Sequence, residues 1–350
     1  MSADSVPLNR PQVKRSGPVI VFLNAFIIGL VALTWCLATQ FSKTALNFDI
    51  QHFNAPYFMM WFNSNFLMTC FPAFLIYERI RSGKQFSKII KESKKSFLDY
   101  KGLNFLTLVK FVIPFLIFNI LANYPYVRAL LLITPSVATS ISACNAAFVY
   151  ILGIIVLHDS IHIMKIVSVL LAIGGVVVTS LDSELRVQWL GIVLATVSAF
   201  MAAVYKVLFK KMIGNATLGD VSLFMTSLGF LNLILNWIPS LILILTGVEL
   251  FNINYAPWVP MLGAAFLSML FNFTINFGVA ILNPLTISVG MLCGIPLNTG
   301  IDILFRGVHA TTFFIIGTSL IMASFLLIII PYDKFKSSNK SKEKIALERL

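Results

Sequence analysis

The chain has 350 residues, of which 58% are hydrophobic and 11% charged, and its formal net charge is +12. An average globular domain carries about 25% charged residues, so this composition excludes an ordinary soluble protein and favours a chain built of membrane-spanning helices. Membrane topology therefore explains the positive charge better than nucleic-acid binding does, and we expect no nucleic-acid partner.

Ten apolar segments follow one another along the chain, most of them close to the roughly 20 residues that an α-helix needs to cross a bilayer. From the N-terminus they are Val19–Phe41, Phe53–Tyr77, Phe105–Leu131, Thr134–Leu157, Ile163–Leu181, Trp189–Phe209, Val221–Gly247, Trp258–Leu282, Pro284–Phe305 and Thr311–Ile330. We predict an all-α polytopic membrane protein with ten transmembrane helices, flanked by polar tails over residues 1–17 and 332–350.

The spacing of these segments repeats and divides the chain into two blocks. A very short connection, His158–His162, joins the fourth and fifth segments, and another, Gly307–Ala310, joins the ninth and tenth. With an odd number of helices per block, the second block enters the membrane from the opposite face, as in the inverted repeats of many secondary transporters. We therefore predict two inverted five-helix repeats, over residues 18–181 and 189–331.

Basic residues gather on one side of the predicted membrane. If the segments alternate, twenty Lys and Arg residues lie on the side of the tails and the loop Arg79–Lys101, against three on the other side, Lys43, Arg186 and Arg306. Cytosolic loops carry such an excess, so both termini are predicted to be cytosolic. The C-terminal tail carries no sorting motif, which leaves the plasma membrane and the Golgi or another endomembrane as alternatives.

Sequence motifs for catalysis or metal binding are not found. The four cysteines lie in apolar segments without paired spacing, which is not typical of a disulfide framework or a zinc site. His158 and His162 are four residues apart, but no third ligand lies near them in the sequence. We predict no catalytic residues, no metal and no cofactor, and a protein that is not an enzyme.

Polar and aromatic side chains within the apolar segments are the candidates for a substrate path, because each must be satisfied inside the protein or in a wet cavity. The predicted substrate-binding residues are Trp35, Tyr124, Arg128, Thr139, Asn145, Tyr205, Lys206, Asn272, Asn276, Asn298 and Asp302. We expect them to line one cavity between the helices.

Several of these candidates have an alternative, structural role. Amide side chains commonly join membrane helices by hydrogen bonds, and Trp35 suits core packing as well as stacking on a substrate ring. Lys206 lies close enough to the cytosolic end of its helix to extend toward that surface beside Lys210. Asp302 lies one helical turn before Arg306 and can pair with it.

Five stretches of sequence are similar to those of one transporter family. They are Asn123-Tyr-Pro-Tyr-Val-Arg-Ala-Leu130, Ala143-Cys-Asn-Ala-Ala-Phe-Val149, Tyr205-Lys-Val-Leu-Phe-Lys210, Asn276-Phe-Gly-Val-Ala280 and Ile295-Pro-Leu-Asn-Thr-Gly-Ile-Asp302. Together they resemble the F subfamily of solute carrier family 35, within the drug/metabolite transporter superfamily. The resemblance implies the ten-helix EamA-type fold with a central site, alternating access, and thiamine as one substrate to consider.

The sequence as a whole favours a secondary transporter of a small organic metabolite. Thiamine follows from the resemblance, whereas Arg128 and Lys206 suit an anion, so a thiamine phosphate fits equally well. One alternative is a nucleotide-sugar or other phosphorylated-metabolite exchanger; an alternative of another class is a non-transporting membrane receptor or scaffold. The expected partners are the small-molecule substrate and the lipid bilayer, with a homodimer as a further option.

Overall fold

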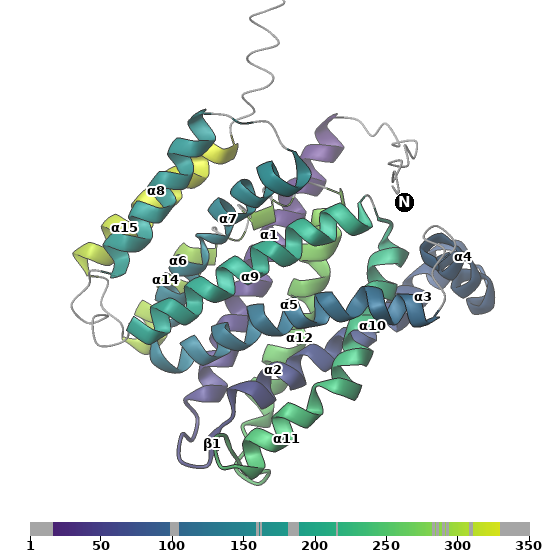
Figure 1. The fold of residues 1–350 in the computed structure, drawn as a ribbon, viewed down its shortest axis with the longest axis horizontal. Coiled ribbons are helices and arrows are strands. Elements are labelled where there is room, and N and C mark those ends of the chain that lie inside the picture. Colours follow the sequence, from purple (N-terminus) through teal and green to yellow (C-terminus); the bar gives the residue numbers. More distant parts are fainter. Residues whose placement is uncertain are drawn as a thin grey trace, which may run out of the picture.

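The computed structural model describes residues 17–98, 105–158, 161, 163–180, 189–214, 216–281, 284, 287–288, 291, 294–307 and 311–329. Both predicted tails, apart from Gly17, lie outside the described residues. The described chain is almost entirely helical (Figure 1).

Within the part of the chain that the structure describes, seven stretches of helix are long and apolar enough to cross a membrane. They are Phe26–Leu46, Pro56–Ser82, Val109–Leu132, Pro135–Leu157, Trp189–Ile213, Leu218–Leu245 and Trp258–Ile281. Two shorter apolar stretches, Ile166–Gly175 and Thr312–Ser324, accompany them. The protein is thus an all-α polytopic membrane protein.

Elements in the first part of the chain run from the N-terminal helix to residue 180. They are α1 (Gly17–Leu46), β1 (Phe53–Asn54), α2 (Pro56–Asn65), η1 (Phe66–Thr69), α3 (Cys70–Ser82), α4 (Phe86–Leu98), α5 (Phe105–Leu132), α6 (Pro135–Ser142), α7 (Asn145–Leu152), the π-helical turn η3 (Gly153–Leu157) and α8 (Ile163–Ser180).

The second part of the chain begins with α9 (Trp189–Ile213) and ends, among the described residues, with α15 (Thr312–Ile329). The described elements between them are α10 (Leu218–Leu235), α11 (Trp237–Leu245), β2 (Leu250–Phe251), α12 (Trp258–Ile281) and α14 (Gly294–Arg306).

Several of the predicted helices are interrupted or begin later than the hydropathy pattern indicates, and one of them, Val221–Gly247, divides at Asn236 into α10 and α11. The predicted helix over Phe53–Tyr77 begins too early, because Phe53 belongs to β1 and Pro56 is the first residue of α2, a position that proline favours. The fourth segment is broken between α6 and α7. At this break the N–H of Ala143 donates to the carbonyls of Thr139 and Ser140, at 3.1 and 3.2 Å, so the helix tightens without a proline or glycine.

The three most extensive helix pairs are α5 with α9, α1 with α12, and α8 with α15. Each pair joins a helix from the first part of the chain to one from the second, and α8 and α15 lie side by side at one edge of Figure 1. Between α1 and α12 the contact is close, because a Cβ atom on Gly263 would lie 2.5 Å from Cδ1 of Phe41. Residues from both parts of the chain therefore pack together in the same apolar clusters.

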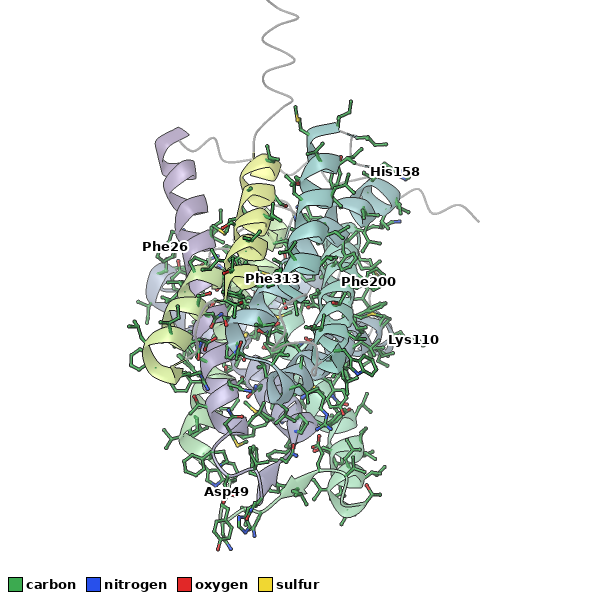
Figure 2. All side chains as sticks on the ribbon, turned by 90° about the vertical axis from the view of Figure 1, so that its left-hand side faces the viewer. Phe26, Asp49, Lys110, His158, Phe200 and Phe313 are labelled. Atoms are coloured by element: carbon green, nitrogen blue, oxygen red, sulfur yellow. The ribbon has the colours of Figure 1, made fainter. Side chains whose placement is uncertain are left out.

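Large apolar side chains cover the outside of the bundle, as expected for a surface that faces lipid. Phe26, Phe200 and Phe313 are between 39% and 58% exposed and lie on the outside in Figure 2. Asp49 lies at one end of the bundle and His158 toward the other end in the same view. The end that carries Asp49 also carries the two short strands.

The strands β1 and β2 join the connection after α1 to the connection after α11. They pair antiparallel, with Phe53 opposite Phe251. An isolated pair of strands is marginally stable, and Glu249 adds a second link: its Oε1 accepts from the N–H of Tyr57 at 2.6 Å and its Oε2 from the N–H of Phe58 at 3.1 Å. Burial raises the pKa of the Glu249 carboxyl, although these two N–H groups act against that shift.

Removing this carboxylate should weaken the strand-bearing end of the bundle. We expect Glu249→Ala to lower the free energy of unfolding by about 2 kcal/mol, because two N–H groups at the start of α2 lose a charged acceptor. Thermal unfolding of the purified protein in detergent measures this change. Glu92→Ala is the matched control, since Glu92 forms an exposed ion pair with Lys84 and its loss should leave the unfolding temperature unchanged.

Candidate substrate-binding site

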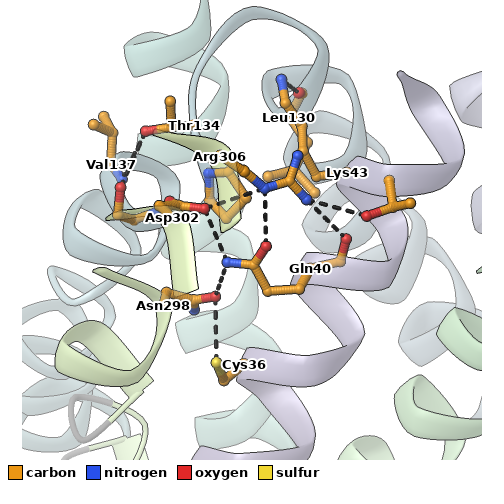
Figure 3. Close-up of polar contacts among 12 residues, drawn as sticks. Cys36, Gln40, Lys43, Leu130, Thr134, Val137, Asn298, Asp302 and Arg306 are labelled. Carbon is orange, nitrogen blue, oxygen red and sulfur yellow. Dashed lines mark hydrogen bonds and ion pairs between the residues drawn. The ribbon is translucent and has the colours of Figure 1, made fainter. Parts of the chain in front are cut away.

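A buried polar cluster connects α1, α6 and α14 (Figure 3). The amide of Gln40 on α1 donates from Nε2 to Oδ1 of Asn298 and to Oδ1 of Asp302, both at 3.0 Å. Oδ2 of Asp302 accepts from the N–H of Ser136 at 2.7 Å, at the first turn of α6. That turn carries unpaired N–H groups and a positive helix end, which favour a carboxylate.

Asp302 and Arg306 also form an ion pair within this cluster. Nε of Arg306 lies 3.3 Å from Oδ1 of Asp302 and donates to Oε1 of Gln40 at 3.1 Å. Asp302 is 1% exposed, so its charge is held by protein groups on three helices. The sequence left open whether Asp302 pairs with Arg306, and the structure contains this ion pair.

Asn298 extends the same cluster toward the middle of the bundle. Its Nδ2 donates to Oγ1 of Thr139 at 2.9 Å, and its Oδ1 also accepts from the thiol of Cys36 at 3.3 Å. The cluster, hereafter the α1–α6–α14 cluster, consists of Cys36, Gln40, Ser136, Thr139, Asn298, Asp302 and Arg306.

A buried cation, Lys43, lies near this cluster on α1. Its Nζ donates to the carbonyls of Leu130 and Ile133, at 2.5 and 3.2 Å, at the C-terminal end of α5. Carbonyls at a helix C-terminus carry partial negative charge, so the lysine stabilises this helix end.

Lys206 on α9 forms a separate polar group with α7 and the segment before α14. It is 3% exposed, and its Nζ donates to Oδ1 of Asn145 at 2.5 Å and to Oγ of Ser288 at 3.1 Å. Sδ of Met291 lies 3.2 Å from the same nitrogen. None of the ion pairs among the described residues includes Lys206, so neutral groups alone surround this buried ammonium group there.

A small cavity lies between α1, α2, α5 and α12 and has a volume of about 40 Å³. The ring of Trp35 borders it and packs against the rings of Tyr126 and Phe271, with centroids 4.7 and 4.6 Å apart. Among the described residues, its lining consists of Trp35, Ala38, Thr39, Ser42, Met60, Asn63, Ser64, Asn123, Tyr126, Val127, Ser268, Phe271 and Asn272.

Tyr124, Tyr205, Asn276 and Arg128 lie outside the two polar groups and the described cavity lining, and Asn272 makes a contact within its own helix. Tyr124 packs edge-on against Tyr57 with ring centroids 5.2 Å apart, and Tyr205 packs edge-on against Phe115. The amides of Asn272 and Asn276 donate to the carbonyls one turn earlier in their own helix, at 2.8 Å. Arg128 is partly buried, and its charge acts on Tyr124 and Glu249.

The structure therefore distributes the predicted residues over several groups instead of one cavity. Thr139, Asn298 and Asp302 meet in the α1–α6–α14 cluster, Asn145 meets Lys206, and Trp35 and Asn272 line the cavity. Sequence reasoning missed Gln40, Lys43, Asn63 and Ser288, although each is polar and lies within or beside an apolar segment, which was the available signal.

Known proteins are similar in sequence to this chain over nearly its whole length. No protein-family model matches it. Human solute carrier family 35 member F3 is 33% identical over 335 residues, which cover 93% of this chain and 76% of the relative. Mouse solute carrier family 35 member F4 is 32% identical over 91% of this chain and 66% of the relative. An uncharacterised vacuolar membrane protein of Saccharomyces cerevisiae is 23% identical over 87% of this chain and 89% of the relative. A solved crystal structure with 15% identity shares the fold, with a TM-score of 0.56 over 88% of this chain and 98% of that chain.

Proposed function

The chain belongs to solute carrier family 35, and from this membership we propose that it is a secondary active transporter of a small organic metabolite bearing an anionic group such as a phosphate ester. The observation that carries the choice of an anion is Lys206. A buried ammonium group surrounded by neutral partners is costly unless an opposite charge joins it. A substrate phosphate would supply that charge through charge-assisted hydrogen bonds.

The charge of Asp302 argues against a cationic substrate at that position. Its carboxylate already pairs with Arg306 and accepts hydrogen bonds from Gln40 and Ser136. A thiamine phosphate fits this charge balance better than free thiamine, and a nucleotide sugar also meets the requirement for a phosphate. We infer that the substrate class is a phosphorylated metabolite.

Alternating access by two inverted five-helix repeats, over residues 18–181 and 189–331, is the mechanism we propose. Support comes from the positions of the two buried polar groups along their helices. The α1–α6–α14 cluster lies near the end of α1 that leads into β1, whereas Lys206 lies one turn before Lys210, which donates to the carbonyl of Ala280 at the far end of α12. In this mechanism the α1–α6–α14 cluster closes the substrate path at one end of the bundle, the residues around Lys206 close it at the other end, and the two closures alternate.

Uptake into proteoliposomes tests this function directly. We expect saturable uptake of thiamine monophosphate or of a nucleotide sugar, accelerated by the same compound inside the vesicles, and weaker uptake of free thiamine. Empty liposomes and liposomes containing the heat-denatured protein are the controls. Uptake that never saturates would identify a channel, and absence of uptake for every compound would favour the receptor or scaffold.

Membrane orientation is a further expected result. Both termini and the Arg79–Lys101 loop should be cytosolic, because this side holds the excess of Lys and Arg. An epitope tag at either end should bind antibody after digitonin has opened the plasma membrane alone, in whichever membrane the protein resides. A tag that binds antibody on intact cells would contradict the orientation. The vacuolar relative makes an endomembrane the location to examine first.

A further inference from the structure

Exposed apolar and basic side chains lie next to one another at the end of α3. The stretch Pro56–Ser82 has 27 residues. Its length as a helix is about 40 Å, whereas the hydrocarbon core of a bilayer is about 30 Å thick. The last turn of α3 therefore reaches the level of the lipid headgroups. Ile76 and Ile80, one turn apart, are 57% and 81% exposed, and Arg79 and Arg81 are exposed beside them.

The helix α4 begins four residues after α3 ends and is held against the bundle. It contacts both α3 and α10, and the three helices lie together at one side of the molecule in Figure 1. Ile89 is 2% exposed, and Ser93 is also buried. At the first turn of α10, a Cβ atom on Gly219 would lie 3.2 Å from Oγ of Ser93. Membrane topology requires only basic charge in this region, whereas this helix is folded onto the protein and holds its side chains in place.

The other face of α4 is basic. Lys88 and Lys91 are three residues apart, so they share one face of the helix, and both are exposed. At the start of α4, Cζ of Arg79 lies 4.7 Å from the ring centroid of Phe86. This cation–π contact joins the end of α3 to the start of α4. The basic side chains of the two helices therefore belong to one surface.

Four exposed basic residues of this surface, hereafter the α3–α4 basic patch, are Arg79, Arg81, Lys88 and Lys91. None of the ion pairs among the described residues includes a member of the patch, whereas Lys84 pairs with Glu92 at 2.7 Å. From residue 76 to residue 92 the chain has five basic and two acidic residues, a net charge of +3. Such a cluster directly after a membrane-spanning helix attracts anionic lipids.

We propose that the α3–α4 basic patch binds the headgroup of an anionic phospholipid such as phosphatidylserine, whose acyl chains lie against Ile76 and Ile80. The two arginines donate charge-assisted hydrogen bonds to its phosphate, and the two lysines of α4 attract the remaining negative charge. The orientation proposed above places this end of the bundle in the cytosol, and the cytosolic leaflet contains such lipids. The inference does not depend on the proposed transport function.

Native mass spectrometry of the purified full-length protein tests the proposal, because it counts individual bound lipids. Phosphatidylserine and phosphatidylcholine with the same acyl chains are added in equal amounts. We expect phosphatidylserine to bind at least tenfold more tightly, and this preference to fall as the ionic strength is raised. Glycerophosphoserine, the soluble form of the headgroup, should not displace phosphatidylserine at the same concentration, because it lacks the acyl chains.

Two test variants each remove two charges from the patch: Arg79→Gln/Arg81→Gln and Lys88→Gln/Lys91→Gln. Each basic residue near an anionic surface contributes about a fivefold factor in affinity, so each variant should weaken phosphatidylserine binding at least tenfold. Lys110→Gln/Lys211→Gln is the matched control, because it removes two exposed lysines of α5 and α9 outside the patch. It should change binding by less than about twofold. All these side chains are exposed, so the unfolding temperature should not change.

Equal binding of the two phospholipids would overturn the inference, and so would an equal loss of binding in the control and the patch variants. Displacement of phosphatidylserine by an equal concentration of glycerophosphoserine would show that the patch binds soluble anions and not a lipid. Because the readout is lipid binding, a negative result would leave the transport function standing. A protein that binds phosphatidylserine as expected but transports none of the compounds would keep the lipid site.

Discussion

Replacing Lys206 by glutamine is expected to abolish measurable uptake of a phosphorylated substrate while leaving the fold intact. The ammonium group provides the buried positive charge on this part of α9, and hydrogen bonds to a charged group contribute about 1.5 to 3 kcal/mol each. Losing one such bond weakens substrate binding about 10- to 150-fold. Glutamine keeps a donor for Oδ1 of Asn145, so hydrogen bonding within the protein continues.

Stability measurements separate this role from a structural one. A buried charge without an ionic partner is costly, so we expect the unfolding temperature of Lys206→Gln to equal or exceed that of the wild type. Lys211→Gln is the matched control, because Lys211 lies on the exposed part of the same helix. Equal and small effects of both variants on uptake would refute the role of Lys206 in substrate binding.

Asp302→Asn is expected to have the second large effect, on stability as well as on transport. The asparagine leaves the partly buried Arg306 without its counter-charge and gives the N–H of Ser136 a weaker acceptor. Breaking a buried pair from one side costs about 3 to 5 kcal/mol. Because the side chain of Arg306 is 21% exposed, we expect a loss at the lower end of this range, about 3 kcal/mol. Thermal unfolding in detergent measures it.

A double-mutant cycle tests whether the ion pair explains this loss. The variant Asp302→Asn/Arg306→Gln removes both charges, so it should be no less stable than either single variant, with a coupling energy of about 1 to 3 kcal/mol. Additive losses would show that the two residues act independently.

Transport measurements on the Asp302→Asn variant distinguish two roles of this carboxylate. Either it helps to hold one end of the substrate path closed, or it carries a proton that couples transport to a pH gradient. If the ion pair closes one end of the path, exchange and gradient-driven accumulation should fall together, and Arg306→Gln should reproduce the effect. If the carboxylate carries a coupling proton, exchange should persist while accumulation driven by a pH gradient is lost.

Hydropathy was sufficient to predict the positions of most helices. The segment Trp189–Phe209 corresponds to α9, which extends to Ile213, and Trp258–Leu282 corresponds to α12 within one residue. Such agreement is expected, because the bilayer fixes the length of an apolar helix. The break after Ser142 could not be read from the pattern, since Ala143 and Cys144 are compatible with a continuous helix.

The grouping of the polar residues was not predictable from the sequence. Gln40 and Asn298 are 258 positions apart, and their contact depends on how α1 packs against α14. Lys43 looked like a surface charge by position alone, whereas its ammonium group is buried against the last carbonyls of α5. Sequence spacing identifies neighbours on one helix, such as Asp302 and Arg306, and contacts between helices require the tertiary structure.

The pairing of α8 with α15 has a consequence for biosynthesis. Ribosomes complete α8 at Ser180, but its partner ends at Ile329, so at about 5 to 20 residues per second the nascent chain waits roughly 7 to 30 s for the pairing face of α8 to be covered. During that interval lipid or an assembly factor must shield this face. A premature stop before Thr312 would leave it exposed permanently, and the truncated product would then present a surface by which quality control could recognise it.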